Sequence, residues 1–286
     1  WIRINATTFD ESIVFSGIGA TKNNFLIDLY LKQEEEVNFL SSKYSSNQEV
    51  FKKIIDSLVL EKKVSWIKMD SINNLSPIAQ KVTQAAYIYP YASIRERYAL
   101  LRSSKWTEAK DSLFFSYRKF LNYGDNDLAF FDPYVNYILN YISQKALKVG
   151  EPYFRAKETT SFNVRRLEIL DKMISGKLLR NNLARAIAFE EMLKFKNQTE
   201  HDLFLQYYAT VNSSKEYLRE VLELHKDISK MSNGKPLPKV LLQNFERKTV
   251  NSASLAYGKS TVIYFWSQTQ MNQYRNTLNR LNRLKS

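Results

Sequence analysis

The chain has 286 residues, of which 44% are apolar and 14% aromatic, and it contains only 7 glycines, 6 prolines and no cysteine. So few turn-forming residues argue against a fold rich in β-strands, and the apolar content is enough for a substantial core, so long helices are expected. The missing cysteines exclude disulfide bonds and thiol chemistry. The formal charge of +13 favours anionic partners, which include nucleic acid, phosphorylated lipid head groups and acidic proteins.

Residues 1–20 are predicted to form a short β-element. Apolar and polar residues alternate over residues 2–5 and again over part of residues 11–16, which indicates two short strands. The first helix is expected to follow over about residues 25–40, with Asn23 or Asn24 as its N-cap.

Residues 21–231 are predicted to form a helical domain of antiparallel helices joined by short loops. Asn47 is expected to cap the second helix and Ser214 the last one. Pro90 is expected to divide the stretch after Ser76 into two helices, because proline interrupts a helix. The remaining predicted helices cover about residues 48–67, 77–89, 91–103, 107–123, 133–147, 162–174, 177–196, 200–211 and 214–230.

The C-terminal part is predicted to be a separate α/β unit over residues 236–286. A Gly/Pro cluster at residues 233–238 indicates a linker, and a strand, a turn and a second strand are expected after it. The unbroken apolar run at residues 262–266 predicts a strand that is covered on both faces. Apolar residues then recur at helical spacing from Met271 to Leu281, which predicts an amphipathic helix.

This C-terminal pattern resembles the TlpA-like branch of the thioredoxin family. The family's sequence motifs are matched in order by Gly258-Lys259, the apolar strand and Phe265-Trp266-Ser267, and the Gly/Pro cluster upstream also matches. The resemblance places Gln270 and Gln273 where the family has the two cysteines of its Cys-x-x-Cys motif. It therefore implies a redox-inactive domain that needs no cofactor and carries no catalytic thiol.

The resemblance implies that the thioredoxin-like unit is incomplete in this sequence. Ser286 follows the first helix of the unit, and the later strands of the family fold are missing from the sequence. A lone strand and helix would expose a sheet edge and an apolar face, so we expect either further residues or a partner that covers them. Trp1 in place of methionine favours a processed chain or a fragment.

The helical region is similar to cell-envelope proteins of Bacteroidota. The similarity is carried by FSGIGATKN from Phe15 to Asn23 and by DPYVNYILNY from Asp132 to Tyr141. It implies an α+β protein in the periplasm, with a lipoprotein anchor in the outer membrane as one form of attachment. The expected role is that of a non-enzymatic scaffold or accessory subunit for other cell-envelope proteins. The sequence contains no run of about 18 apolar residues, so no transmembrane helix is predicted.

Two other classes of function stay open from the sequence. The aromatic residues between Tyr87 and Tyr141 could line a carbohydrate or peptide groove, which would make the helical domain a ligand-binding or enzymatic one, although helical spacing favours core packing. A basic nucleic-acid binder is the second class, although the basic residues are dispersed among acidic ones. His201 and His225 have no ligand set near them in sequence, so no metal site is predicted. The densest basic surface is expected on the last helix, at Arg275, Arg280 and Arg283.

Overall fold

A computed structural model describes most of the chain. The described residues are 2–3, 13–105, 112–194, 198–231, 234–244, 246–256, 258, 261, 263–264, 274, 276–280 and 282. The chain divides into two compact units, Trp1–Lys226 and Asp227–Ser286. The predicted linker at residues 233–238 begins shortly after this division.

The N-terminal β-element is a two-stranded antiparallel sheet. It consists of β1 (Ile2–Arg3) and β2 (Val14–Phe15), with Ile2 opposite Phe15. The prediction that Asn23 or Asn24 caps the first helix is wrong, because α1 (Ala20–Lys43) already begins at Ala20. Asn24 instead lies one turn inside α1, where its side-chain amide accepts a hydrogen bond from the Phe15 N–H at 2.8 Å and donates one to the Phe15 carbonyl at 3.0 Å. The amide thus attaches β2 to the bundle as a strand partner would.

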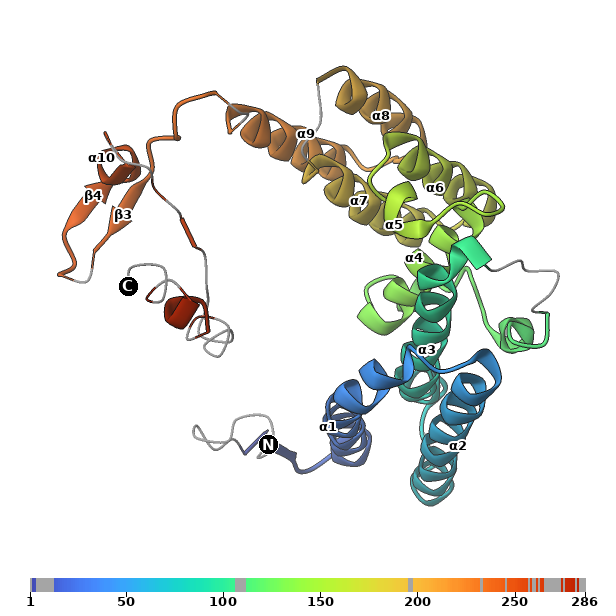
Figure 1. The fold of residues 1–286 in the computed structure, drawn as a ribbon. Helices are drawn as coiled ribbons and strands as arrows, with labels where there is room; N and C mark the ends of the chain where they lie inside the picture. The colour runs from blue at the N-terminus through green and yellow to red at the C-terminus, as the bar shows by residue number, and fades with distance from the viewer. Residues whose placement is uncertain are drawn as a thin grey trace. The chain divides into compact units, whose positions relative to one another are not determined.

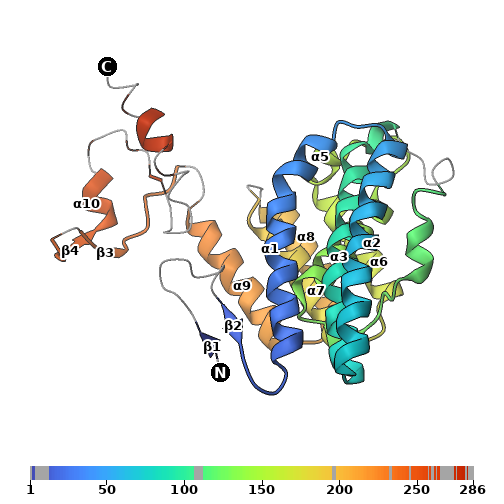
Figure 2. The same ribbon diagram turned by 90° about the horizontal axis from the view of Figure 1, so that it is seen from below.

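Three long helices form the first half of the bundle. They are α1, α2 (Gln48–Asn73) and α3 (Pro77–Leu101), and they contact one another in pairs (Figures 1 and 2). The predicted cap at Asn47 is confirmed, since its side chain accepts a hydrogen bond from the Val50 N–H. Asn74 ends α2 in the left-handed conformation with φ of 46°. A small core of Leu40, Phe51, Ile55, Tyr91 and Tyr98 joins these helices.

The prediction that Pro90 separates two helices is wrong, because α3 runs through it without a break. Proline has no N–H, so the carbonyl four residues earlier loses its helical partner. That carbonyl belongs to Ala86, and the Gln33 side chain of α1 donates to it at 3.0 Å. The neighbouring helix therefore satisfies the backbone group that the proline leaves open, and the continuous helix survives.

The prediction of an aromatic-rich helix over residues 107–123 is also wrong for the residues of this range that the structure describes. Residues 112–115 form turns, and residues 116–120 form a short 3-10 helix, η2 (Ser116–Phe120), while residues 106–111 lie outside the described residues. Phe114 and Phe115 are both buried, with their rings edge to face at 5.3 Å. Adjacent residues of an α-helix point about 100° apart, so a turn buries this pair more readily than a surface helix would. Two further 3-10 turns are η1 (Ser103–Lys105) and η3 (Asn126–Leu128).

The second half of the first unit holds its main core. Its helices are α4 (Asp132–Ala146), α5 (Tyr153–Ala156), α6 (Thr160–Met173), α7 (Lys177–Met192), α8 (Gln198–Val211) and α9 (Lys215–Lys230). The last turn of α9, from Asp227, belongs to the second unit. Helix α4 packs on α3 and on α6, so it connects the two halves. The core between these helices includes Tyr137, Leu183 and Phe204, which are fully buried. The predicted cap at Ser214 is confirmed by its hydrogen bond from the Tyr217 N–H.

The second unit contains a small hairpin. Strands β3 (Leu241–Gln243) and β4 (Thr249–Asn251) pair antiparallel, with Leu242 opposite Val250, and the short helix α10 (Ser252–Ala256) follows. The predicted strand, turn and strand after the linker are therefore present. Of the strand predicted at residues 262–266, residues 263 and 264 have no regular structure, and the others lie outside the described residues. Residues 274, 276–280 and 282 are helical, as the spacing predicts. The described chain is thus an α+β protein in which helix dominates.

Candidate functional site

An apolar pocket lies between α2, α3 and the segment from η2 to Leu121. Its volume is about 300 Å³, which is at the lower end for small-ligand sites. The walls are formed by apolar side chains of all three segments, namely Ile55, Val59, Ile88, Ala92, Phe120 and Leu121.

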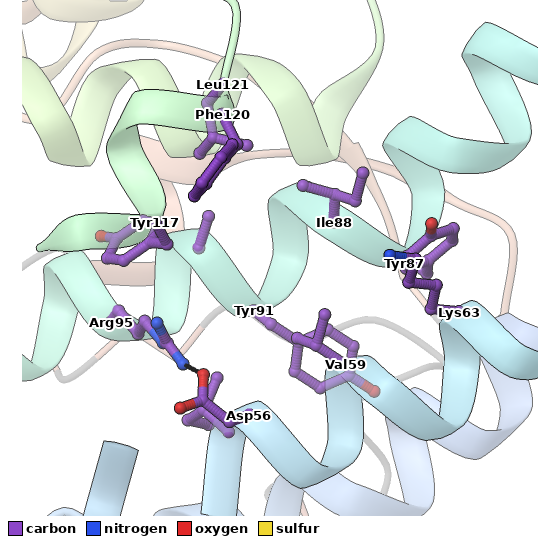
Figure 3. A pocket seen from close by; sticks show the side chains of 12 residues that line it. Asp56, Val59, Lys63, Tyr87, Ile88, Tyr91, Arg95, Tyr117, Phe120 and Leu121 are labelled. Carbon is purple, nitrogen blue, oxygen red and sulfur yellow. Dashed lines mark hydrogen bonds and ion pairs between the residues drawn. The ribbon is translucent and has the colours of Figure 1, made fainter. Parts of the chain in front are cut away.

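The three segments line different sides of this pocket. In Figure 3, Phe120 and Leu121 approach from one side and Val59 of α2 from the other, with Ile88 and Tyr91 of α3 between them. Phe120 is 86% exposed, so its ring stands at the rim and contributes little to the core. The pocket is therefore open to solvent on the side of Phe120.

Arg95 is the buried cation of the pocket. Its side chain is almost completely buried, it forms an ion pair with Asp56 (Figure 3), and its guanidinium lies over the Tyr117 ring at 4.9 Å. Burial acts to raise the pKa of Asp56, but the hydrogen bonds and the positive charges of Lys52 and Arg95 outweigh it and hold that pKa below its usual value. The Nε of Arg95 is buried and has no hydrogen-bond partner among the described residues. Arg95 thus keeps one N–H donor without a partner among the described residues.

A second ion pair supports the wall behind Arg95. Arg118 donates to the fully buried Glu96 from Nε at 2.8 Å and from a terminal nitrogen at 2.5 Å. Tyr117 donates its hydroxyl to the same carboxylate at 2.6 Å. Burial and then the Glu96 charge raise the pKa of Tyr117 well above its usual value, so its hydroxyl remains a donor. This bidentate pair attaches η2 to α3.

A third charged group lies on the far side of Tyr91. The Tyr91 hydroxyl donates to Glu36 at 2.6 Å, and Lys62 forms an ion pair with the same carboxylate at 2.6 Å. Burial, followed by the hydrogen bond to Glu36, raises the pKa of Tyr91 far above its usual value. Tyr91 therefore presents its ring to the pocket and directs its polar end away from it.

The arrangement suits binding better than acid–base chemistry. A general acid or base needs a pKa near the working pH and an open path to the substrate. Here the carboxylates of Asp56, Glu96 and Glu36 are each paired with a cation. The pocket offers an apolar chamber whose lining includes the buried Arg95 and the exposed Lys63.

The site residues predicted from the sequence lie almost entirely outside the part of the chain that the structure describes. This holds for Gln270, Gln273, Arg275 and Arg283. Arg280 is described, and it is helical and exposed. The degenerate redox positions and the basic surface of the last helix therefore stay predictions.

The aromatic residues noted in the sequence are divided between core and pocket. Tyr134 and Tyr137 are fully buried in the main core, whereas Tyr87 and Tyr91 line the pocket with Tyr117. The sequence does not single out Asp56 and Arg95. For Arg95, one indication was present in the sequence. Tyr87, Tyr91 and Arg95 are spaced by four residues, which places all three on one face of α3.

The two histidines, far apart in sequence, meet in the fold. The rings of His201 on α8 and His225 on α9 lie edge to face at 5.2 Å, and both are buried. Among the described residues, no group of three or more histidines and carboxylates could hold a metal ion. Within the same residues, no helix combines the length and the apolar character that a membrane span requires.

Comparisons of the chain with models of protein families, with curated proteins and with solved structures found no match.

Proposed function

We propose that the protein is a non-catalytic scaffold or accessory subunit, and that its helical bundle binds a partner protein through the apolar pocket. The observation that carries this proposal is the open pocket with Phe120 exposed at its rim. Solvent-exposed aromatic rings beside a hollow are typical of protein-binding surfaces. The partner would insert an apolar side chain between Val59, Ile88 and Phe120.

Exposed apolar side chains next to the pocket support this role. Leu60, Val64 and Ile67 of α2 are 61%, 59% and 48% exposed, and their spacing places them on one face of the helix. Leu60 and Ile67 also share a row with the pocket residues Asp56 and Lys63, since all four recur at intervals of three or four residues. A partner seated in the pocket could cover this row as well.

Paired charges support a binding role over a catalytic one. Each carboxylate beside the pocket has a cationic partner, and the tyrosine hydroxyls of Tyr91 and Tyr117 donate to carboxylates. These groups hold the walls in place, and none is left poised for proton transfer.

For the C-terminal unit, we propose the beginning of a redox-inactive, TlpA-like thioredoxin domain. The hairpin β3–β4 and the helical residues 276–280 occur in the order that the resemblance requires. Gln270 and Gln273 would occupy the cysteine positions, and a chain without cysteine cannot exchange disulfides. The proposed setting is the periplasm, with other cell-envelope proteins as partners. Turnover of insulin disulfides by the purified chain would contradict this part.

Site-specific photo-crosslinking in cells tests the proposed binding. A benzophenone amino acid at Phe120 is expected to give a discrete cross-linked species. The same amino acid at Leu203 of α8, which is 59% exposed, serves as the control. The proposal is wrong if both positions give the same products or if neither gives one.

A pocket-filling substitution shows whether the pocket itself is needed. Ile88→Trp places a larger side chain in the pocket, so the cross-link from position 120 should disappear. Ile78→Trp makes the same change at a position of α3 that is 53% exposed and outside the pocket, and it should leave the cross-link in place. Persistence of the cross-link in the Ile88→Trp protein would mean that the partner does not enter the pocket.

A further inference from the structure

A second, polar pocket lies on another side of α3. Its volume is about 390 Å³. Its lining residues come from the end of α1 and from each of the helices α3, α4, α5, α6 and α7. Its chemistry is opposite to that of the apolar pocket, since its lining contains two arginines, two asparagines, two serines and two tyrosines. No residue that the structure describes lines both pockets.

Arg97 is the unpaired cation of this polar pocket. It is exposed, and it forms neither a hydrogen bond nor an ion pair with any described residue. The other arginine, Arg166, is 3% exposed and forms an ion pair with Glu190. Among the described residues, Glu190 is the only acidic residue in the lining. Its charge and that of Arg166 cancel, so Arg97 leaves the pocket positive.

Arg166 retains an unused donor in the same lining. One of its terminal nitrogens donates to Asn163 at 2.9 Å, and both terminal nitrogens contact Glu190. Its Nε is buried without a hydrogen-bond partner among the described residues. A buried N–H without a partner has a free-energy cost.

Neutral polar groups surround the two arginines. Asn140 donates from Nδ2 to the Ser93 hydroxyl at 2.7 Å, which leaves the Asn140 carbonyl free to accept and the Ser93 hydroxyl free to donate. Burial raises the pKa of Tyr44 and of Tyr153 although the charge of Arg97 acts to lower both, so both hydroxyls remain protonated. The Arg97 charge reaches both tyrosines, and the lining therefore offers donors and at least one acceptor around a cation.

We propose that this polar pocket binds a sugar that carries an oxyanion, with Arg97 paired to the anionic group and Asn140, Ser93 and the two tyrosines bonded to its hydroxyl groups. An anion alone would satisfy the donors but not the Asn140 carbonyl, which needs an O–H or N–H. A neutral sugar would leave Arg97 without a counter-charge. A sugar carboxylate and a sugar phosphate share the required chemistry. This site is independent of the partner-binding pocket.

Calorimetric titration of the full chain at constant ionic strength tests the proposal. The probes are glucuronate, glucose 1-phosphate, glucose and inorganic phosphate. At least one of the two anionic sugars should bind at least about tenfold more tightly than glucose and than inorganic phosphate, because each lost charge-assisted hydrogen bond has about that effect. Which of the two binds more tightly identifies the anionic group as carboxylate or phosphate.

Two substitutions separate the roles within the pocket. Arg97→Gln should reduce the affinity for the better-bound anionic sugar by about tenfold or more. Arg219→Gln removes the same charge from an arginine of α9 that is 70% exposed, and it should leave that affinity unchanged. Asn140→Leu should reduce the preference for the anionic sugar over inorganic phosphate, because it removes the acceptor. Helical circular dichroism checks that the variants fold.

Three results would overturn the inference. The first is that neither anionic sugar binds more tightly than glucose. The second is an equal effect of Arg97→Gln and Arg219→Gln. The third is binding of a hexa-aspartate peptide as tight as that of the anionic sugars, with the same loss in Arg97→Gln, which would mean that the pocket recognises an acidic peptide.

Discussion

The helical bundle and the C-terminal hairpin bury their apolar residues to very different extents. In the bundle, Leu183, Ile187 and Phe204 are fully buried against helices on several sides. In the hairpin, Leu241 and Leu242 remain 74% and 42% exposed. Burying apolar area is the main favourable term in folding, so the bundle contains its own stabilising core.

The difference shows what each region needs for stability. A two-stranded hairpin has no second layer to cover its apolar face and is at best marginally stable alone. In the bundle, α4 packs on α3 and on α6, and α6 packs on α7 and α8, so apolar side chains are covered by several helices. Changes in the core of the bundle should therefore reduce stability strongly, whereas equivalent changes in the hairpin should have little effect.

Removal of the Glu96 carboxylate should have the largest effect. Glu96→Ala leaves Arg118 buried without its counter-charge, and breaking a buried pair in this way costs about 3–5 kcal/mol. Urea unfolding followed by helical circular dichroism measures the change. Glu223→Ala removes a carboxylate that is 68% exposed and lies 4.0 Å from Arg219, and it should cost less than about 1 kcal/mol. Similar losses in the two variants would show that the Glu96–Arg118 pair is not a structural element.

Truncation of one leucine in each region compares the two directly. Leu183→Ala should destabilise the bundle by about 2–5 kcal/mol, because it leaves a cavity in a closed core. Leu241→Ala should change the stability by no more than about 0.5 kcal/mol, because most of its side chain already contacts water. The same unfolding experiment measures both. A large effect of Leu241→Ala would mean that another surface covers the hairpin.

Alkaline pH should selectively weaken the tyrosine-rich bundle. Burial raises the pKa of Tyr123 to about 12 although the hydrogen bond from Tyr137 acts to lower it, and burial raises the pKa of Tyr134 and of Tyr137 further. Unfolded tyrosine loses its proton near pH 10, whereas these residues keep theirs in the fold. Their contribution is therefore fully present below about pH 10 and is lost as the pH rises towards 12, by up to about 1.4 kcal/mol per pH unit for each tyrosine.

Urea unfolding at pH 8, 10, 11 and 12 measures this loss. Tyr123→Phe should show a smaller decrease between pH 10 and 12 than the unchanged chain, because one proton fewer is linked to folding. Equal stability at pH 8 and pH 12 would contradict the assignment of the tyrosines to the core.

A more modest loss is expected from a change beside the helix that contains Pro90. Gln33→Ala removes the donor to the Ala86 carbonyl and should cost about 1 kcal/mol. In a Pro90→Ala background the restored N–H can bond to that carbonyl, so the cost of Gln33→Ala should decrease. A double-mutant cycle measures this coupling. Additive effects would mean that Gln33 does not compensate for the proline.

Most of the helices follow from local patterns in the sequence. Asn47 and Ser214 cap helices where they were predicted, because capping depends on a side chain and an N–H three residues away. The hairpin after the linker follows in the same way from two apolar runs and the turn between them. The predictions failed at Asn24, at Pro90 and over residues 112–123, where contacts from other elements decide the local structure.

The candidate sites were harder to predict from the sequence than the helices were. Asp56 and Arg95 are 39 positions apart, and Arg97 differs from other surface arginines only in what surrounds it. The residues that line each pocket come from several separate segments, and no local pattern records that they meet.

The sequence by itself determined where most helices begin and end, and that the chain has no thiol chemistry. Periodicity, caps and composition act within a few residues or do not depend on the fold at all. Only the tertiary structure decided that α3 continues through Pro90, that the carboxylates beside the apolar pocket are paired with cations, and that Arg97 stands without a counter-charge in a polar one. The reason is that burial and ion pairing depend on distances across the fold, which packing sets between residues far apart in the chain.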